Sequence, residues 1–375
     1  MAGYTFTREF RKLDRTMPLT IISSDDGYSY PKPMLSNALA KGKTADQIIL
    51  SDHAKMAQML DATILINNTV EHIDPDNHRL TLDDGSQHHY HKLVLAVGAS
   101  PVALPIKGDA TNEIISINNL RDYRKFREKL KQVNHIVLIG SGLIGCEFAN
   151  DLIANTDLRV SVVGRSATPI DTMLPEPMAK QLQYYLAEAG VEWHLQTTTH
   201  AINYGDSHVD LVLSSGVTLH ADLVVSAIGL QANIQLASQA GLEVNHGIVT
   251  NQFLQTTDKD IYALGDCAEV MGHNLLFIAP LLASAKALAK TLTGEKKAIQ
   301  FPAMPVTIKT PLYPIVVSSP ARGAKGKWII ENNDSDYGMK ALFVDDDDRL
   351  LGFALSGDAI ANKQELTKQV PKILS

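Results

Sequence analysis

The stretch that most constrains the fold is HIVLIGSGLIGCEF, residues 135–148. An apolar run leads into Gly140, Gly142 and Gly145, which have the spacing G-x-G-x-x-G, and a helical pattern follows. In such a strand–turn–helix unit the first glycine permits a tight turn, the second lets the backbone approach a pyrophosphate, and the third lets the helix pack on the strand. A second apolar strand, RVSVVG, follows at the distance of a βαβ unit. These features predict a dinucleotide-binding unit rather than a glycine-rich turn without a ligand.

The end of that second strand is where an acidic residue usually binds the ribose 2′-hydroxyl of NAD. Here the chain reads Val163-Gly164-Arg165, without a carboxylate. Arg165 can pair with a 2′-phosphate or be a solvated loop cation, so the sequence leaves NADH and NADPH open. The residues that we expect at this coenzyme are Gly140, Gly142, Leu143, Ile144, Gly145, Arg165 and Gly229.

Short β-branched runs alternate with helical patterns along most of the 375 residues, which predicts an α/β protein of two or three domains. Examples are a helix at Gly3–Leu13 and strands at Leu19–Ser24 and Leu93–Ser100. We expect a first domain at 1–107 that resumes at 232–298, a second domain at 108–231, and a small α+β domain at 299–375.

Composition excludes several classes of function. With a net charge of −7, nucleic acid is an unfavourable partner. The two cysteines, Cys146 and Cys267, are far apart, which excludes a disulfide framework and a C-x-x-C redox pair and favours a reducing, cytoplasmic setting. No apolar stretch is long enough to insert in a membrane, and we identify no signal peptide.

The start of the chain resembles the end of a second dinucleotide turn. Met1-Ala2-Gly3 precedes an amphipathic helix and then a strand, but the first strand and the first two glycines of that turn are not in the sequence. Such a strand is central in a parallel sheet, and its loss costs stability comparable to that of a whole domain. We therefore expect the native chain to begin about a dozen residues upstream, since a βαβ turn needs that strand, and the 375-residue form to fold poorly and retain FAD weakly.

Several longer motifs carry a resemblance to a known family. The stretches KPMLSNAL, LIGSGLIGCEFANDL, VVSAIGL, IYALGDCAEV and MPVTIKTP resemble the rubredoxin reductases of alkane-oxidising bacteria, over the chain from Met1 to the C-terminal domain. The resemblance implies two Rossmann-like domains, for FAD and NAD, and a small C-terminal domain over the flavin. It also implies an oxidoreductase that passes electrons from NADH through FAD to rubredoxin in alkane degradation.

The same resemblance implies a set of FAD contacts. In the GDC sequence, Asp266 would hold the flavin ribityl chain, whereas on its own it would more commonly be a helix N-cap. The expected FAD contacts are Ala2, Gly3, Ser23, Ser24, Lys32, Val70, Glu147, Asp266, Ile278 and Lys309.

No side chain is expected to act as an acid or base, because the flavin carries the chemistry. In related ferredoxin reductases a Glu at the position of Glu147 pairs with a Lys that here is Asn37. We expect Lys309 or Lys32 to replace that Lys, and Glu147 and Lys309 to tune the flavin. A helix at Pro280–Leu288 would direct its positive end at the flavin pyrimidine, besides packing in the core.

Other interpretations are weaker. Both cysteines are expected to be buried packing residues, so a thiol-based reductase or peroxidase is disfavoured. The run His88-His89-Tyr90-His91 is interpreted as a solvated hairpin rather than a metal site, and Asp345–Asp348 as a charged turn rather than a Ca²⁺ loop. The alternatives that stay open are a ferredoxin-type reductase and a nucleotide-binding flavoprotein without turnover.

Overall fold

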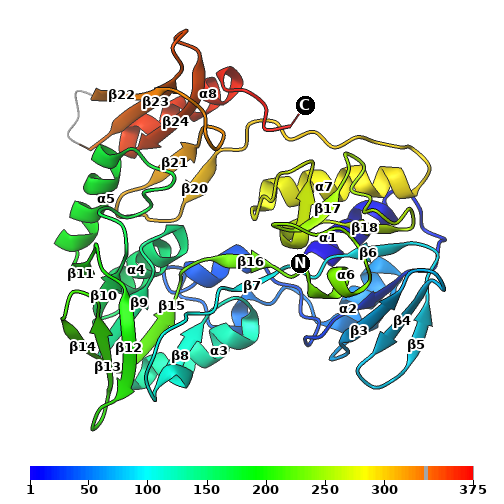
Figure 1. Cartoon of the computed structure of the whole chain (residues 1–375), viewed down its shortest axis with the longest axis horizontal. Coiled ribbons are helices and arrows are strands. Elements are labelled where there is room, and N and C mark those ends of the chain that lie inside the picture. Colours follow the sequence, from blue (N-terminus) through cyan, green and yellow to red (C-terminus); the bar gives the residue numbers. More distant parts are fainter. Residues whose placement is uncertain (333–336, 375) are drawn as a thin grey trace.

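A fully parallel five-stranded sheet lies at the centre of the middle lobe, drawn in cyan to green in Figure 1. Its strand order is β11-β10-β9-β15-β8. The computed structural model describes residues 1–332 and 337–374. The strands are β8 (Ile114–Ser116), β9 (His135–Ile139), β10 (Arg159–Val163), β11 (Val191–His194) and β15 (Leu223–Ser226). All residues of β9 and β15 are buried, which explains their largely apolar sequences, because both faces of a parallel sheet are covered by other elements.

The remaining elements of the middle lobe cover this sheet. An antiparallel sheet, β12-β13-β14, packs its apolar side chains on Val137, Ile139 and Val224. The helices are α3 (Leu120–Lys129), α4 (Leu143–Asn155) and α5 (Glu176–Glu188), and the antiparallel strands are β12 (Thr199–Tyr204), β13 (Val209–Leu213) and β14 (Thr218–Ala221).

The N-terminal lobe, on the right in Figure 1, combines the beginning of the chain with residues beyond the middle lobe. Its parallel strands occur in three separate pairs, β1–β2, β6–β18 and β17–β19, beside an antiparallel sheet β3-β4-β5. The parallel pairs are formed by β1 (Thr20–Ile22), β2 (Thr63–Leu65), β6 (Leu93–Leu95), β17 (Ile248–Thr250), β18 (Ile261–Ala263) and β19 (Ala268–Val270). The other elements are α1 (Ala2–Arg11), α2 (His53–Leu60), β3 (Val70–Asp74), β4 (Arg79–Leu82), β5 (Gln87–His89), α6 (Gln235–Gln239) and α7 (Ile278–Leu292).

Helix α1 confirms the amphipathic helix expected at the start of the chain. Its Phe6 and Phe10 are buried, with ring centroids 5.7 Å apart, and belong to the same core as Leu281 and Leu288 of α7. The first and last segments of the lobe are therefore held together by one apolar core.

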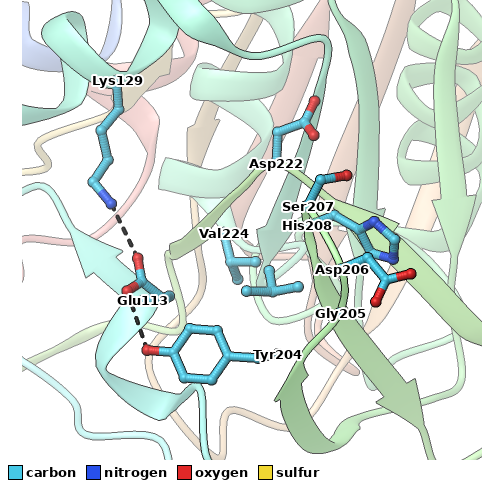
Figure 2. A pocket seen from close by; sticks show the side chains of 10 residues that line it. Glu113, Lys129, Tyr204, Gly205, Asp206, Ser207, His208, Asp222 and Val224 are labelled. Carbon is cyan, nitrogen blue, oxygen red and sulfur yellow. Dashed lines mark hydrogen bonds and ion pairs between the residues drawn. The ribbon is translucent and has the colours of Figure 1, made fainter.

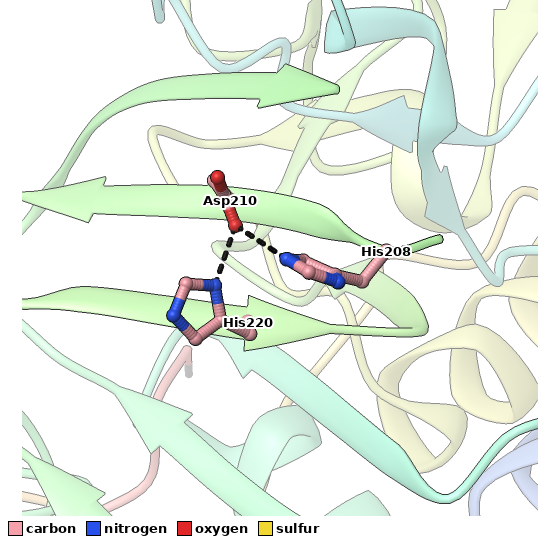
Figure 3. Close-up of side chains that lie close together, drawn as sticks. All are labelled: His208, Asp210 and His220. Atoms are coloured by element: carbon pink, nitrogen blue, oxygen red, sulfur yellow. Dashed lines mark hydrogen bonds and ion pairs between the residues drawn. The ribbon is translucent and has the colours of Figure 1, made fainter. Parts of the chain in front are cut away.

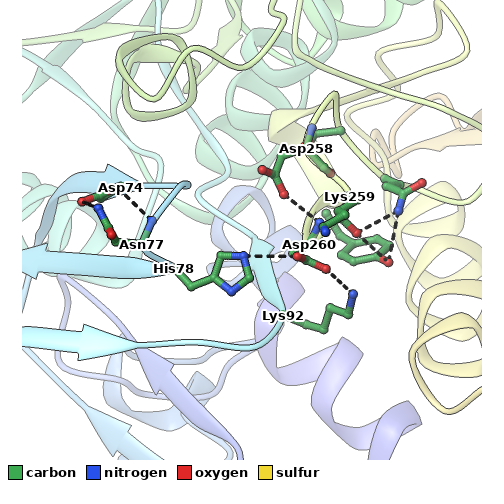
Figure 4. Close-up of polar contacts among 10 residues, drawn as sticks. Asp74, Asn77, His78, Lys92, Asp258, Lys259 and Asp260 are labelled. Carbon is green, nitrogen blue, oxygen red and sulfur yellow. Dashed lines mark hydrogen bonds and ion pairs between the residues drawn. The ribbon is translucent and has the colours of Figure 1, made fainter.

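A polar network joins the antiparallel sheet of the N-terminal lobe to its parallel strands (Figure 4). The Asp260 carboxylate, just before β18, accepts from the Lys92 ammonium beside β6 and lies 3.2 Å from His78 Nε2 in the β3–β4 turn. In that turn Asp74 accepts from the backbone and side chain of Asn77. Asp260 thus connects three segments that are far apart in the sequence.

Two short antiparallel strands, β7 (Ala99–Pro101) and β16 (Leu230–Ala232), run between the N-terminal and middle lobes (Figure 1). The strand that the sequence suggested over residues 93–100 is in fact two, β6 and β7. Gly98, with φ of +70°, separates them, because a residue with positive φ interrupts a strand.

In the part of the C-terminal lobe that the structure describes, a five-stranded antiparallel sheet packs with one helix, which is the α+β composition that the sequence predicts. Tyr313 of this lobe stacks on Tyr185 of α5 at 4.8 Å, so the lobe is anchored to the middle lobe. As expected, Asp345–Asp348 form a turn, between β23 and β24. The elements are β20 (Val306–Ile308), β21 (Ile315–Ser318), β22 (Lys327–Asn332), β23 (Met339–Val344), β24 (Leu350–Ser356) and α8 (Lys363–Gln369).

Short 3-10 turns complete the chain: η1 (Lys32–Ser36), η2 (Asp46–Ile48), η3 (Thr111–Glu113), η4 (Leu130–Gln132), η5 (Gly265–Cys267) and η6 (Gly357–Asn362). Within residues 1–332 and 337–374, no helix combines the length and the apolar character that crossing a bilayer requires.

Candidate nucleotide and electron-transfer site

The glycine turn between β9 and α4 has the geometry of a dinucleotide cradle. Gly140 has φ of +119°, and a Cβ there would come within 2.5 Å of the Ala227 carbonyl oxygen. A Cβ on Gly145 would come within 1.9 Å of the Gly140 carbonyl oxygen, whereas one on Gly142 would meet nothing within 4 Å. Gly140 and Gly145 therefore serve close packing, and Gly142 leaves open space at the start of α4.

The start of α4 is suited to a negatively charged ligand. Gly142 is the N-cap and offers no side chain to the first backbone N–H groups of the helix. Those groups and the helix dipole attract phosphate. Leu143 is half-buried and Ile144 is 40% exposed, so both border the turn on its solvent side.

The other two residues expected at the nicotinamide coenzyme also flank the carboxyl end of this sheet. Arg165 follows β10 and is exposed, and Gly229 follows β15 with φ of +119° and open space around it. Gly164 lies so close to Ser141 that a Cβ there would meet the Ser141 hydroxyl at 2.2 Å. The loop after β10 therefore passes directly over the glycine turn.

The N-terminal lobe gathers a second set of expected residues. A Cβ on Gly265 would lie 3.0 Å from the Ala2 side chain, and a Cβ on Gly3 would lie 3.9 Å from Ala96. The start of α1 thus lies close to η5 and to the residue that follows β6. The three sequence stretches are AGY at α1, LVLAVG at β6 and GDC at η5, and they are far apart in the sequence.

Lys32 and Asp266 lie close enough to influence each other electrostatically. Burial raises the pKa of Asp266, and the Lys32 charge opposes that shift. Burial likewise lowers the pKa of Lys32, and Asp266 opposes it. Neither charged group has a hydrogen-bond partner among the described residues. Half-buried charges without hydrogen bonds are costly, so this pair is suited to a polar ligand.

Three further expected FAD residues lie at the edge of the same lobe. Ser23 directly follows β1, where its carbonyl accepts from the Asn68 backbone and its hydroxyl donates to Asp25. Ser24 is exposed beside it. Val70 begins β3 two residues beyond Asn68 and is half-buried.

Glu147 is the point where the three lobes meet. This carboxylate in α4 is buried, with 1% of its side chain exposed. It lies 2.8 Å from the Lys309 Nζ atom, and it accepts hydrogen bonds from the Lys309 backbone at 2.9 Å and from the Ser36 hydroxyl at 2.7 Å. Of the two lysines that the sequence offered as replacements, Lys309 makes the pair with Glu147, while Lys32 lies near Asp266 instead.

The neighbouring polar residues of α4 strengthen this junction. Asp151 accepts from the backbone of Leu39 and Ala40, and Asn150 accepts from the backbone of Leu312. The Lys309 ammonium also donates to the Pro33 carbonyl at 2.6 Å. One face of α4 therefore fixes both the loop after η1 and the segment after β20.

Helix α7 begins at Ile278, two residues earlier than the sequence suggested. Pro280 is thus its third residue, still within the first turn, where no backbone N–H is needed for the helix. Phe277, the N-cap, makes no side-chain hydrogen bond, and Ile278 is 37% exposed. The free N–H groups at this end are available to a ligand.

The residues present fit an FAD molecule on two structural grounds. Among residues 1–332 and 337–374, the carboxylate of Asp266 and the ammonium of Lys32 have no hydrogen-bond partner, and the Asn37 Oδ1 atom is buried without one. The N-terminal ends of α1, α4 and α7 carry no side-chain caps. A dinucleotide with hydroxyls, phosphates and a polar ring supplies the missing partners.

Thiol chemistry does not fit. Cys146 and Cys267 are free and fully buried. Burial raises the pKa of both thiols, that of Cys267 to about 11, so neither is a thiolate at neutral pH.

A polar pocket of about 280 Å³ lies at the opposite, amino-terminal edge of the five-stranded sheet (Figure 2). Its walls include Asp222 before β15 and Glu113 before β8, where Glu113 pairs with Lys129 at 3.2 Å. The glycine turn follows the carboxyl end of β9, so this pocket is separate from the coenzyme site. The sequence analysis did not identify it, because its residues come from four separate segments of the chain.

Residues 1–286 match the family model described as pyridine nucleotide-disulphide oxidoreductase. The chain belongs to this family. Its members use FAD and NAD(P)H, and this flavoprotein oxidoreductase has the sites for both. Residues 298–370 match a second model, described as rubredoxin binding C-terminal domain.

Individual relatives are similar in sequence to this chain over its full length. The chain is 44% identical to a rubredoxin-NAD(+) reductase of Alcanivorax borkumensis, covering 100% of this chain and 97% of the relative. It is 45% identical to a rubredoxin-NAD(+) reductase of Acinetobacter baylyi, covering 100% and 96%. Among solved structures, a putidaredoxin reductase–putidaredoxin complex matches with a TM-score of 0.89 and 25% identity, over 99% of this chain and 91% of that one. The expected α/β flavoprotein fold is thereby confirmed.

Proposed function

We propose that this chain is an FAD-dependent reductase that passes electrons from NADH to rubredoxin, a small iron protein, in alkane hydroxylation. One observation carries the proposal: a rubredoxin-binding domain at 298–370 is joined through Lys309 to Glu147, two residues beyond the last glycine of the G-x-G-x-x-G turn. The donor site and the acceptor domain are therefore directly connected. The curated relatives with this name match the whole chain.

Each lobe is assigned one ligand or partner. We assign FAD to residues 1–107 and 232–298, NAD(P)H to 108–231, and the acceptor to 299–375. The FAD contacts are those expected from the sequence, Ala2, Gly3, Ser23, Ser24, Lys32, Val70, Glu147, Asp266, Ile278 and Lys309. The coenzyme contacts are Gly140, Gly142, Leu143, Ile144, Gly145, Arg165 and Gly229.

Bound FAD supplies the redox chemistry, because it accepts a hydride from nicotinamide and releases electrons one at a time. The side chains and backbone of the protein bind the two nucleotides and orient the flavin ring. The starts of α1 and α4 hold the pyrophosphates of the two nucleotides, and the Asp266 carboxylate accepts hydrogen bonds from ribityl hydroxyls. The free N–H groups at the start of α7 stabilise negative charge on the ring.

The Glu147–Lys309 pair is a positioning element for the ring. Glu147 is held by three donors, so its carboxylate stays fixed in position while Lys309 keeps the C-terminal lobe in place. Burial excludes water from the carboxylate, which strengthens its electrostatic effect on a neighbouring ring. No side chain needs to transfer a proton for hydride transfer.

Stopped-flow spectroscopy tests the proposal. The purified holoprotein is mixed with NADH or NADPH, and bleaching of the flavin absorbance is followed; the reduced protein is then mixed with oxidised rubredoxin. We expect fast bleaching and fast rubredoxin reduction. Fast bleaching with transfer only to a ferredoxin would favour a ferredoxin-type reductase, and a yellow protein that NADH does not bleach would favour binding without turnover.

The choice of coenzyme is tested at Arg165. We propose NADH as the donor. NADH has a 2′-hydroxyl in place of the 2′-phosphate that an arginine binds, so Arg165→Ala should leave the kcat/KM for NADH within about two-fold. A fall of the same size for NADH and NADPH would contradict an assignment of Arg165 to the 2′-phosphate. We also propose a cytoplasmic location, where NADH is available and both thiols stay reduced.

A further inference from the structure

Two imidazoles and one carboxylate converge on the outer face of the β13–β14 hairpin, far from the glycine turn (Figure 3). One oxygen of Asp210, Oδ1, lies 3.0 Å from His208 Nε2 and 2.6 Å from His220 Nδ1. All three donor atoms lie within 4.8 Å of one another. The sequence analysis did not identify this cluster; as metal sites it considered only the runs at 88–91 and 345–348, and it disfavoured both.

Strand register accounts for the convergence. Asp210 and His220 are directly opposite each other in the antiparallel pair, and His208 is two residues before Asp210. Because side chains alternate along a strand, all three project from the same face of the sheet. On one face of a sheet, the nearest neighbours of a side chain are the one two residues along the same strand and the one directly opposite on the next strand. His208 and His220 have these two positions relative to Asp210.

The opposite face of the hairpin anchors this arrangement. Val209, Leu211 and Leu219, which alternate with the polar residues, are buried in the core below the hairpin. The backbone that carries the cluster is therefore fixed by packing, and only the side chains need to adjust.

Gly205 makes room for one of the imidazoles. The turn between β12 and β13 closes with a hydrogen bond of 2.9 Å from the Gly205 backbone to the His208 carbonyl. A Cβ at position 205 would lie 2.7 Å from His208 Nε2, so a larger residue there would push the imidazole out of this position. The nitrogen that faces Asp210 is thus the one that the turn accommodates.

We propose that His208 Nε2, His220 Nδ1 and Asp210 Oδ1 form a binding site for a divalent late first-row transition metal of the Zn²⁺ class. Imidazole and carboxylate donors suit such ions, with metal–donor distances of about 2.0–2.2 Å. Donors arranged tetrahedrally at that distance lie about 3.4 Å apart, so the three side chains need to move by about 1 Å or less. Three protein donors leave a fourth position for water or another ligand.

The surroundings favour a cation. Asp206 and Asp222 line the adjacent pocket together with His208 (Figure 2), and the ammonium of Lys129 in the same pocket is paired with Glu113. The carboxylates raise the local concentration of cations. Because the pocket opens beside His208, the fourth metal position is accessible to solvent.

Isothermal titration of the metal-free holoprotein with Zn²⁺ tests the proposal, and titration with Co²⁺ gives a visible spectrum that reports coordination. Three variants, His208→Ala, His220→Ala and Asp210→Asn, each remove one donor. His200→Ala is the matched control, because His200 is an exposed histidine on the neighbouring strand β12. We expect one Zn²⁺ per chain for the wild type and the control.

Each of the three variants is expected to lower the affinity by about 10-fold or more, since changing even a residue that only orients a ligand costs about 10- to 100-fold. Zn²⁺ should also raise the Tm of the wild type and of His200→Ala but not of the three variants, because an ion that binds the folded state stabilises it. Asp210→Asn preserves side-chain shape, so it reports on the ligand even if an alanine variant folds poorly. No saturable binding by the wild type, or equal affinity in all variants, would overturn the proposal and leave the cluster as a hydrogen-bonded pair of histidines on Asp210.

Discussion

Replacing Lys309 by methionine should loosen the junction of the three lobes. The substitution preserves most of the length of the side chain but removes its charge from the buried Glu147 carboxylate, 2.8 Å away. Removing one partner of a fully buried ion pair costs about 3–5 kcal/mol. Lys309 is itself 26% exposed, and Glu147 retains donors from Ser36 and from the backbone at position 309. We therefore expect a loss of about 2 kcal/mol.

The matched control is Lys340→Met in the C-terminal sheet. Lys340 is 24% exposed and pairs with Glu331 at 3.0 Å, but Glu331 is 48% exposed. Water can solvate Glu331 when its partner is removed, so this change should cost less than about 1 kcal/mol. The two lysines differ mainly in the burial of the carboxylate that each leaves behind.

Thermal unfolding of the holoprotein, followed by circular dichroism and by release of flavin fluorescence, measures both variants. At about 2–4 °C per kcal/mol, Lys309→Met should lower the Tm by about 4–8 °C. Combining it with Glu147→Gln should recover part of the loss, because glutamine leaves no unpaired charge. Equal Tm values for Lys309→Met and Lys340→Met, or additive effects in the double variant, would refute the reasoning. An unchanged rate of flavin reduction by NADH in Lys309→Met would separately refute its role at the flavin.

Gly142→Ala should leave the Tm within about 1 °C of the wild type, because surface changes without new contacts cost little. The added methyl group should nevertheless raise the KM for NADH about 10-fold, because it blocks the approach of the pyrophosphate. An unchanged KM would contradict this. The hydrogen bond from Lys92 lowers the pKa of Asp260, so the ionised carboxylate stabilises the fold at pH values above its ordinary pKa of 3.8, and that stability is lost as the pH falls through the folded pKa. Acid titration of unfolding should show a weaker dependence below pH 4 for Asp260→Asn. Finally, a thiol reagent should label neither Cys146 nor Cys267 at pH 8 until the chain is denatured; rapid labelling of native protein would refute their burial.

Local patterns predicted the elements whose structure depends on near neighbours. The turn at Gly140–Gly145 could be predicted because its three glycines lie within six residues directly after a strand. Helix α1 could be predicted because its buried residues recur on one face. Boundaries were less accurate. Helix α7 begins at Ile278 rather than Pro280, because proline is tolerated throughout the first turn and so does not mark the first residue.

Contacts between distant segments could not be predicted in the same way. The sequence offered Lys32 and Lys309 equally as partners for Glu147, and only the packing of the C-terminal lobe on α4 brought Lys309 to it. His208 and Asp210 are two residues apart, but their partner His220 is visible only from the register of β13 and β14.

The sequence by itself determined the class of the protein. The glycine turns, the GDC segment and the C-terminal pattern are each one continuous stretch of sequence, and the residues of each stretch determine its local backbone conformation. The tertiary structure alone decided which charges meet. A buried carboxylate is stabilised only by groups within a few ångströms, and that proximity depends on lobe packing and strand register, which no single segment of the chain contains.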